Sequence, residues 1–331
     1  MSLVLIHCQF WNRFWSVPAA EVEKLQAELP EFRFTNALTA QEMRGLLPEA
    51  EVYLGYRLTS EDISKASKLQ WIHVPAANVY GFDMDLLAER GIVLTNSRGM
   101  HAIPIAEHVI GSMLVFSRRY IDCWKYQQQQ HYAQVEILNE PPPLSELKGK
   151  TIGILGFGHI GREVGRLAKA FGMKVLATKR TTASGEENQN VDVFYPAAEF
   201  RKILAESDYL VISMARTEET EGLIGNAELS LLKPTSVLIN IARGSIVDQN
   251  ALIRFLKEGK IRGAALDVFD KEPLPSDSQL FALPNVFLTP HVAGVSTVEH
   301  WPRLMRLFAE NLKRFTQKQP LINVVDLNAG Y

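Results

Sequence analysis

A short glycine-rich segment near the middle of the chain constrains its fold more than any other feature. A β-branched run beginning at Thr151 leads into Gly156-Phe-Gly158-His-Ile-Gly161, and an apolar-periodic stretch typical of a helix follows from Val164. This order is that of a dinucleotide-binding unit, in which the first glycine makes the turn, the second admits the pyrophosphate and the third lets helix and strand pack closely. The phosphates would face the helix N-terminus. The segment therefore predicts binding of NAD or NADP.

No carboxylate stands where the adenine ribose is expected to bind. In such units an acidic residue about 20 residues beyond the glycines accepts hydrogen bonds from the 2′-hydroxyl of NAD. Here the second strand, 174–178, is followed by Lys179, Arg180 and Thr181, and no carboxylate occurs before Glu186. Cations and hydroxyls suit a 2′-phosphate, so NADP is favoured, with NAD as the alternative; otherwise both cations are solvated loop charges. The candidate cofactor-binding residues are Gly156, Gly158, His159, Ile160, Gly161, Lys179, Arg180 and Thr181.

Composition narrows the class of protein. The chain has 331 residues, 47% of them hydrophobic and 22% charged, which is ordinary for a globular protein of two domains. A net charge of -2 provides no basic field for nucleic acid, and no stretch approaches the apolar length of a membrane span. The N-terminus lacks a charged leader, and Cys8 and Cys123 are too few for a disulfide or metal framework. We expect a cytoplasmic protein without a metal or a nucleic-acid or membrane partner.

Strand and helix patterns alternate in two series, separated by a Pro-rich bridge at 141–143. We expect strands at 4–8, 51–55, 71–74 and 93–95, then at 151–155, 174–178, 210–213, 237–240, 264–267 and 286–289, and helices at 20–29 and 60–66. An apolar pattern runs from Ala102 to about Gln130, where a glutamine run marks a helix end. Alternation of this kind predicts parallel sheets. The fold class is therefore α/β, with a Rossmann dinucleotide-binding domain and a flavodoxin-like substrate domain meeting at a cleft.

Polar residues follow successive strands of the second series. Arg243 comes just after one strand, Asp267 ends the next, Glu272 lies shortly beyond and His291 follows the last. Each could be a loop cation, a turn cap, a solvated charge or a structural histidine. Because the carboxyl ends of parallel strands meet at one edge of a sheet, we expect the four to converge on one site instead.

With these motifs the chain resembles the D-isomer-specific 2-hydroxyacid dehydrogenases. The segments that carry the likeness are 95–99, 105–108, 156–161, 240–248, 266–273 and 289–291, in this order along almost the whole chain. The resemblance implies that Arg243 binds the substrate carboxylate and keto oxygen, that His291 is the acid/base and that Glu272 orients it. It also implies that Ala242 and Asp267 contact the cofactor, Asp267 at the nicotinamide end.

The resemblance further implies a domain division and an oligomeric state. A helical pattern at 298–315 is expected to cross back to the first domain, so the substrate domain would comprise residues 1–98 and 296–331 and the Rossmann domain residues 99–295. The long central helical region would make a homodimer. Where the family commonly has glycines in its substrate loop, this chain has Ala76, Ala77 and Asn78, whose backbone amides can still bind a carboxylate.

The chemistry of the candidate residues fits reduction of a 2-oxo acid without a metal. An arginine fork matches a carboxylate and stabilises a developing oxyanion, and a histidine beside a carboxylate can deliver the proton near neutral pH. We therefore expect NADPH-linked reduction of small 2-oxo acids such as glyoxylate or hydroxypyruvate to D-2-hydroxy acids. The alternatives are NAD-linked oxidation of a D-hydroxy acid, and a dinucleotide-sensing regulatory protein like the corepressor relatives of this family.

Overall fold

The chain forms two compact units, each built on one parallel sheet. The computed structural model describes residues 1–9, 13–179 and 188–327. The first unit comprises Met1–Met100 together with the segment that begins at Ser296, and the second comprises His101–Val295. Every pairing between named strands is parallel. The predicted α/β class with two parallel sheets is confirmed.

The sheet of the first unit has five strands in the order β2-β1-β3-β4-β5. This is the flavodoxin-like order, which reverses direction next to β1. The strands are β1 (Ser2–His7), β2 (Phe32–Asn36), β3 (Ala50–Gly55), β4 (Trp71–Val74) and β5 (Val93–Asn96).

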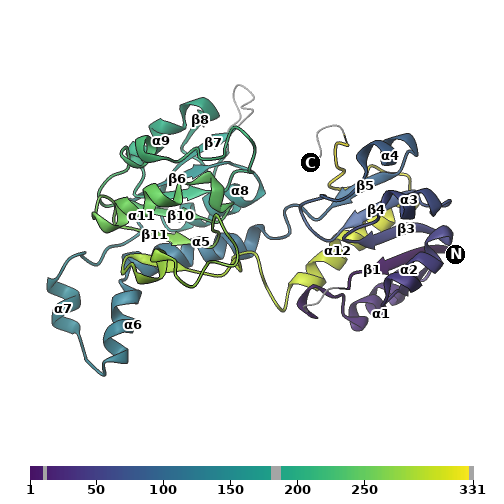
Figure 1. Cartoon of the computed structure of the whole chain (residues 1–331), viewed down its shortest axis with the longest axis horizontal. Helices are drawn as coiled ribbons and strands as arrows, with labels where there is room; N and C mark the ends of the chain where they lie inside the picture. Colours follow the sequence, from purple (N-terminus) through teal and green to yellow (C-terminus); the bar gives the residue numbers. More distant parts are fainter. Residues whose placement is uncertain (10–12, 180–187, 328–331) are drawn as a thin grey trace. The chain divides into compact units, whose positions relative to one another are not determined.

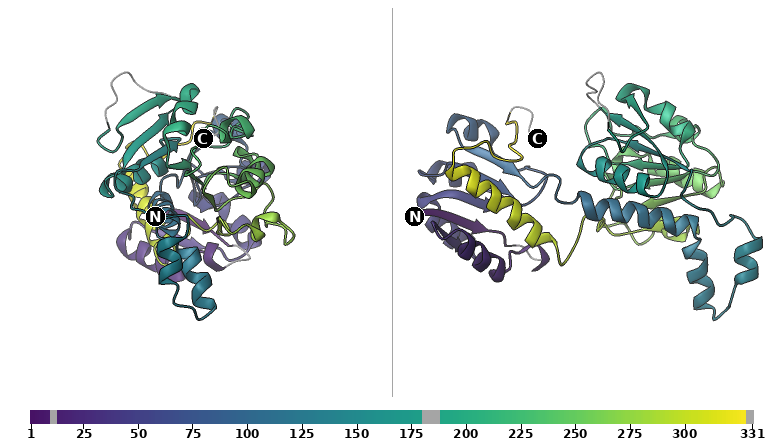
Figure 2. Two further views of the ribbon diagram at one scale, coloured as in Figure 1. Left: turned by 90° about the vertical axis from the view of Figure 1, so that its left-hand side faces the viewer. Right: turned by 180° about the vertical axis from the view of Figure 1, so that it is seen from behind.

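Helices cover both faces of this sheet because its strands alternate between two apolar cores. Along β1, Leu3 and Leu5 belong to one core, whereas Val4 and Ile6 belong to the other. The second core includes the apolar side of α12, which lies across the sheet in Figure 2. The helices are α1 (Ala19–Glu28), α2 (Ala40–Leu46), α3 (Ser60–Lys65), α4 (Met84–Glu89) and α12 (His300–Thr316), with short 3-10 turns η1 (Arg13–Trp15) and η2 (Leu47–Glu49).

A histidine is buried in the middle of this unit. His73 on β4 has no exposed surface; its Nδ1 lies 2.7 Å from Thr95 Oγ1 and its Nε2 lies 3.1 Å from Ser97 Oγ. A neutral ring can donate to one hydroxyl and accept from the other, so both nitrogens are satisfied without a charge. Burial lowers the pKa of His73 to about 3.

Acid is therefore expected to destabilise the first unit through His73. The unfolded chain takes up a proton near pH 6.5, whereas the folded ring does not, so stability is lost as pH falls below 6.5. Between pH 7 and pH 5 the loss is about 2 kcal/mol. Urea unfolding of wild type and of His73→Gln at pH 7 and pH 5 tests this. The difference in unfolding free energy between the two proteins should change by about 2 kcal/mol between these pH values. A difference that is independent of pH would contradict the assignment.

The sheet of the second unit has seven strands in the order β12-β11-β10-β9-β6-β7-β8. Six of them follow the Rossmann order, and the direction of winding reverses between β6 and β9. The strands are β6 (Thr151–Leu155), β7 (Lys174–Lys179), β8 (Val193–Pro196), β9 (Tyr209–Ile212), β10 (Val237–Asn240), β11 (Gly263–Leu266) and β12 (Val286–Leu288).

Two helical layers enclose this sheet, as Figure 1 shows. One apolar core joins the sheet to α9 and α11, and the other joins it to α5 and α8. The helices are α5 (Ala102–Ser117), α6 (Tyr120–Gln128), α7 (Gln134–Asn139), α8 (His159–Ala170), α9 (Phe200–Glu206), α10 (Asn226–Leu229) and α11 (Gln249–Lys257), with 3-10 turns η3 (Ala197–Glu199), η4 (Gly244–Ile246) and η5 (Gln279–Ala282).

The apolar pattern from Ala102 to Gln130 is not one continuous helix. α5 ends at Ser117, and Arg119 adopts a left-handed conformation (φ 57°) before α6 begins. The buried Arg119 guanidinium donates to the carbonyl oxygens of Ile137 (3.0 Å) and Glu140 (2.6 Å). These hydrogen bonds satisfy carbonyl groups at the end of α7 and tie that end to the start of α6. Together α6 and α7 form an arm that stands away from the rest of the unit (Figures 1 and 2).

Candidate active site at the carboxyl edge of the second sheet

The glycine segment forms a tight turn between β6 and α8. Gly156 has φ 96°, and a Cβ there would lie 2.6 Å from the Cα of Met214. A Cβ on Gly161 would lie 2.4 Å from the carbonyl oxygen of Gly156. Both positions therefore require glycine, the first for conformation and space and the second for close packing of the helix against the turn.

Gly158 differs from its neighbours, because a Cβ there would meet no atom within 4 Å. It precedes the first residue of α8, His159, in an extended conformation, and Ile160 follows in the first turn. That turn contains no acidic residue. An open position beside a helix N-terminus without a competing carboxylate fits a pyrophosphate, since the backbone N–H groups and the helix dipole favour an anion there.

The end of β7 is held against this turn. Thr178 Oγ1 accepts a hydrogen bond from Gly156 N at 3.1 Å, and the Thr178 carbonyl accepts one from Phe157 N at 2.9 Å. Lys179, the last residue of β7, directly follows Thr178, which contacts the glycine turn. The other two residues expected to bind a 2′-phosphate, Arg180 and Thr181, lie outside the described residues.

The loop after β10 presents Arg243 to solvent. Buried Asn240 shapes this loop, since its Oδ1 accepts from Ala242 N at 3.1 Å and its Nδ2 donates to the Arg243 carbonyl at 2.9 Å. The Arg243 guanidinium donates through Nη1 to the Ala242 carbonyl at 2.6 Å. Its remaining N–H groups donate to no other group in the part of the chain that the structure describes.

Gly244 brings that loop against the one after β11. A Cβ on Gly244 would lie 1.9 Å from the carbonyl carbon of Phe269, so the two backbones touch. The backbone N–H of Phe269 in turn donates to Glu272 Oε1 at 3.0 Å. Asn240 and Gly244 thus position Arg243 beside the Glu272 loop, a role that the motif alone did not reveal.

Glu272 and His291 form a direct pair. His291 Nδ1 lies 2.7 Å from Glu272 Oε2. Since a carboxylate can only accept, Nδ1 carries the proton and Nε2 faces away from the pair. The imidazole side chain is 50% exposed. No hydrogen bond or ion pair joins Arg243 to either member of this pair among residues 1–9, 13–179 and 188–327.

Asp267 holds the backbone on which His291 sits. Its carboxylate is buried and accepts from Thr289 Oγ1 (2.6 Å), Val292 N (2.9 Å) and Ala293 N (3.0 Å). The Asp267 carbonyl accepts from His291 N at 2.9 Å, and His291 adopts a left-handed conformation with φ 54°. These hydrogen bonds stabilise a conformation that histidine rarely adopts.

His108 on α5 extends this network. Its Nε2 lies 3.4 Å from Thr289 Oγ1, whose own proton goes to Asp267. Burial lowers the pKa of His108, while the nearby Asp267 opposes that shift. A neutral His108 that donates from Nε2 satisfies Thr289 without adding a second charge.

The loop after β4 in the first unit exposes backbone donors. The N–H groups of Ala76, Ala77 and Asn78 donate to no acceptor within the described ranges. Two of their carbonyls are hydrogen-bonded, since Ala76 O accepts from Ser97 N and Ala77 O accepts from Asn96 Nδ2. Asn78 Oδ1 accepts from Tyr80 N, which fixes the turn.

The described residues contain neither a metal-binding cluster nor a membrane-spanning helix. No cluster of three or more His, Cys, Asp or Glu side chains there could hold a metal ion. None of the helices described is both long and apolar enough to span a bilayer.

Comparison with known proteins decides the family. Residues 110–293 match the family described as D-isomer specific 2-hydroxyacid dehydrogenase, NAD binding domain. The chain belongs to this family. It is 37% identical over 264 residues to a glyoxylate reductase of Pyrococcus furiosus, covering 79% of this chain and 77% of the relative. It is 31% identical over 308 residues to a D-3-phosphoglycerate dehydrogenase of Methanocaldococcus jannaschii, covering 92% and 57%.

A solved structure supports the same assignment for this 2-hydroxyacid dehydrogenase family member. The NADPH-dependent glyoxylate/hydroxypyruvate reductase of Sinorhizobium meliloti, solved with NADP and sulfate, superposes with a TM-score of 0.76 at 25% identity, covering all of both chains. The protein is therefore an oxidoreductase that uses a nicotinamide dinucleotide.

Proposed function

We propose that the enzyme reduces small 2-oxo acids, of the glyoxylate and hydroxypyruvate type, to D-2-hydroxy acids. The observation that carries the proposal is the 2.7 Å pair of His291 and Glu272 at the carboxyl edge of a dinucleotide-binding sheet. The loop of Arg243, packed through Gly244 against the Glu272 loop, provides a cation for the substrate carboxylate. The names of the relatives in Pyrococcus and Sinorhizobium support this substrate class.

The glycine turn and the first turn of α8 are the proposed cofactor site. Gly156, Gly158, Gly161 and the first turn of α8 at His159 and Ile160 would hold the cofactor, which when bound supplies the hydride.

The protein's own groups act on the substrate. Arg243 binds the carboxylate and the keto oxygen with the N–H groups it has not used. His291 gives a proton from Nε2 to the carbonyl oxygen as negative charge develops there, and Glu272 holds the ring in place through Nδ1. Asp267 positions this histidine through the backbone of 291–293, and the N–H groups of Ala76, Ala77 and Asn78 add donors for the carboxylate.

Steady-state kinetics with a panel of 2-oxo acids test the proposal. Glyoxylate, hydroxypyruvate and 3-phosphohydroxypyruvate, each with NADPH and NADH, should be compared by kcat/KM through nicotinamide absorbance. The unphosphorylated acids are expected to be reduced best. No turnover with either of them, or a preference for the phosphorylated acid, would overturn the substrate class. Faster oxidation of D-hydroxy acids with NAD would favour the opposite direction.

NADP is the proposed preferred cofactor, with Lys179, Arg180 and Thr181 at the 2′-phosphate and Ala242 also contacting the dinucleotide. Lys179 ends β7, and Thr178 holds that strand end against the glycine turn, which supports the placement.

Lys179→Asp is expected to move preference from NADPH toward NADH. A carboxylate at 179 would repel the phosphate and accept from the ribose hydroxyl, and each charge-assisted hydrogen bond lost with NADPH is worth about 1.5–3 kcal/mol. The ratio of kcat/KM for the two cofactors should therefore change by about tenfold or more. Lys68→Asp, a charge change at an exposed lysine after α3, is the matched control. An unchanged ratio in Lys179→Asp would remove this residue from cofactor selection.

A homodimer formed through the arm is also proposed. Neither α6 nor α7 contains a buried residue. The arm exposes large apolar side chains, namely Tyr120 (54%), Trp124 (60%), Tyr132 (85%), Val135 (67%) and Leu138 (64%). A patch of this kind is typical of a protein interface, and a second copy of the chain would bury it.

Charged substitutions on the arm are expected to separate the dimer. Trp124→Glu combined with Leu138→Glu would place two carboxylates in an apolar interface, which disfavours association because both would lose water. Sedimentation velocity should show wild type as a dimer and the double variant as a monomer. Phe281→Glu, at an equally exposed apolar site outside the arm, should sediment as wild type does. A wild-type monomer, or a dimer in the double variant, would contradict the assignment.

A further inference from the structure

A pocket at the opposite edge of the second sheet is lined by cations that the proposed reaction does not use. It has a volume of about 560 Å³ and is lined by residues that precede strands, among them Lys150 before β6, Asp208 before β9 and Arg262 before β11. The candidate active site follows the carboxyl ends of the same strands. Strands of four or five residues at about 3.3 Å per residue separate the two edges by roughly 13–17 Å. The pocket is therefore distinct from the active site.

Arg262 contributes an incompletely satisfied guanidinium to this pocket. Its Nη2 donates to the Phe116 carbonyl at 2.6 Å, but its Nε is buried and has no hydrogen-bond partner in the described part of the chain. No ion pair to Arg262 or Lys150 is found among the described residues. Burial is the main cause that lowers the pKa of Arg262, and the nearby Arg119 also lowers it, while Tyr209 and Asp122 oppose the shift only in part.

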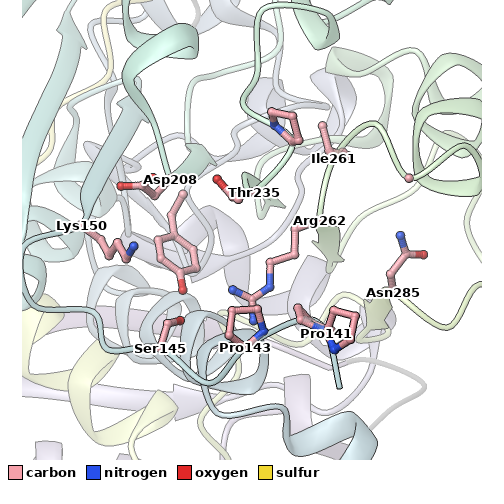
Figure 3. A pocket seen from close by; sticks show the side chains of 13 residues that line it. Pro141, Pro143, Ser145, Lys150, Asp208, Thr235, Ile261, Arg262 and Asn285 are labelled. Carbon is pink, nitrogen blue, oxygen red and sulfur yellow. The ribbon is translucent and has the colours of Figure 1, made fainter. Parts of the chain in front are cut away.

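Asp208, the carboxylate among the residues that line the pocket, already accepts hydrogen bonds from two other groups. Asp208 Oδ1 accepts from Lys233 Nζ at 3.0 Å, and its Oδ2 accepts from Thr151 N at 2.8 Å. Figure 3 shows the Lys150 and Arg262 side chains directed into the pocket. Its local charge is therefore positive, which favours an anion, and a guanidinium fork matches a carboxylate.

The other residues that line the pocket are mostly apolar and indicate what kind of ligand would fit. Pro141, Pro142, Pro143, Pro234, Ile261 and the ring of Tyr209 provide apolar surface. A volume of this size accommodates a small organic molecule.

We propose that this pocket binds a small organic carboxylate with an apolar body. The Arg262 guanidinium and Lys150 Nζ bind the carboxylate, and the prolines contact the body. The site is independent of the proposed reaction at the other edge of the sheet.

Titration calorimetry with 4-hydroxybenzoate as the probe tests this site on the full chain. Binding should be at least tenfold weaker for the neutral isostere 4-hydroxybenzamide and for the variants Arg262→Met and Lys150→Met. Arg254→Met, which removes an exposed guanidinium on α11, should bind as wild type does. Lys150→Met keeps the test valid if Arg262→Met fails to fold, because only Arg262 has a hydrogen bond to α5.

Arg243→Ala separates this site from the active site. Probe binding should persist unchanged in that variant. Loss of binding in Arg243→Ala, equal binding of the amide, or undiminished binding in Lys150→Met and any folded Arg262→Met would each overturn the proposal. So would the absence of probe binding to wild type.

Discussion

Replacing His291 or Arg243 with alanine is expected to abolish most turnover while leaving cofactor binding almost intact. Each side chain lies on a loop beyond a strand end, whereas most of the proposed dinucleotide contacts lie on the glycine turn and at the end of β7. Removing a positioned acid typically costs about 10² to 10⁴ in rate. Removing the Arg243 cation costs a comparable factor, because removal of one oxyanion-stabilising donor costs about 10² to 10³. The kcat/KM for a 2-oxo acid that wild type reduces should fall accordingly.

Matched controls separate this effect from a general loss of charge. His131→Ala removes another exposed histidine that pairs with a glutamate, here Glu136 at 2.7 Å, and Arg254→Ala removes another exposed guanidinium. Both should retain wild-type kcat/KM. NADPH affinity, measured by fluorescence titration, should stay within about twofold in all four variants. Near wild-type turnover in His291→Ala or Arg243→Ala would remove that residue from the mechanism.

Buried central strands were predictable from the sequence, as were the edge strands β5 and β12, whereas the edge strands β2 and β8 were not. β4 (Trp71–Val74) and β10 (Val237–Asn240) match the predicted ranges residue for residue, because strands covered on both faces are continuous apolar runs. The prediction missed β2 and β8, which lie at sheet edges and are only partly buried. Polar residues in β2 and a proline in β8 interrupt the apolar signal.

The division of the central helical pattern depends on contacts distant in sequence. Nothing local marks Arg119 as a break, since arginine is a good helix former. Its guanidinium donates to the carbonyl oxygens of Ile137 and Glu140, which are 18 and 21 residues later in the sequence. These hydrogen bonds form only when α7 has folded. The apolar periodicity of residues 102–130 contains no information about residues 137 and 140, so it could not predict the break at Arg119.

The site shows the same limit. Placement at successive strand ends identified Arg243, Asp267, Glu272 and His291 as candidates, and the family they implied is confirmed. Their roles stay predictions. Contacts between loops, such as that of the Phe269 backbone with Gly244, position these side chains. So do the three hydrogen bonds that the Asp267 carboxylate accepts. Spacing along the chain does not reveal which loops touch.

The three glycines of the turn are expected to respond differently to alanine, and the difference separates fold from cofactor binding. Gly158→Ala should fold as wild type does, because its Cβ would meet no protein atom within 4 Å and its backbone is extended. If the pyrophosphate occupies that open space, the methyl group would cost about 1–3 kcal/mol, or roughly 5- to 150-fold in NADPH affinity. Gly161→Ala should instead destabilise the second unit, because its Cβ would lie 2.4 Å from a backbone oxygen that cannot move aside easily. Gly156→Ala should be at least as damaging, since it adds a positive φ to a backbone clash.

Thermal unfolding and NADPH titration of these variants, with Gly111→Ala on α5 as the control whose Cβ also meets open space, give two independent readouts. Gly158→Ala should lose affinity without losing thermal stability. Gly161→Ala and Gly156→Ala should lose stability even without cofactor, and Gly111→Ala should lose neither. Wild-type NADPH affinity in a folded Gly158→Ala would mean that no phosphate approaches this backbone, and the cofactor would have to bind elsewhere on the sheet edge. An equal loss of affinity in Gly111→Ala would show that a methyl group perturbs the second unit generally, because α5 packs against α8.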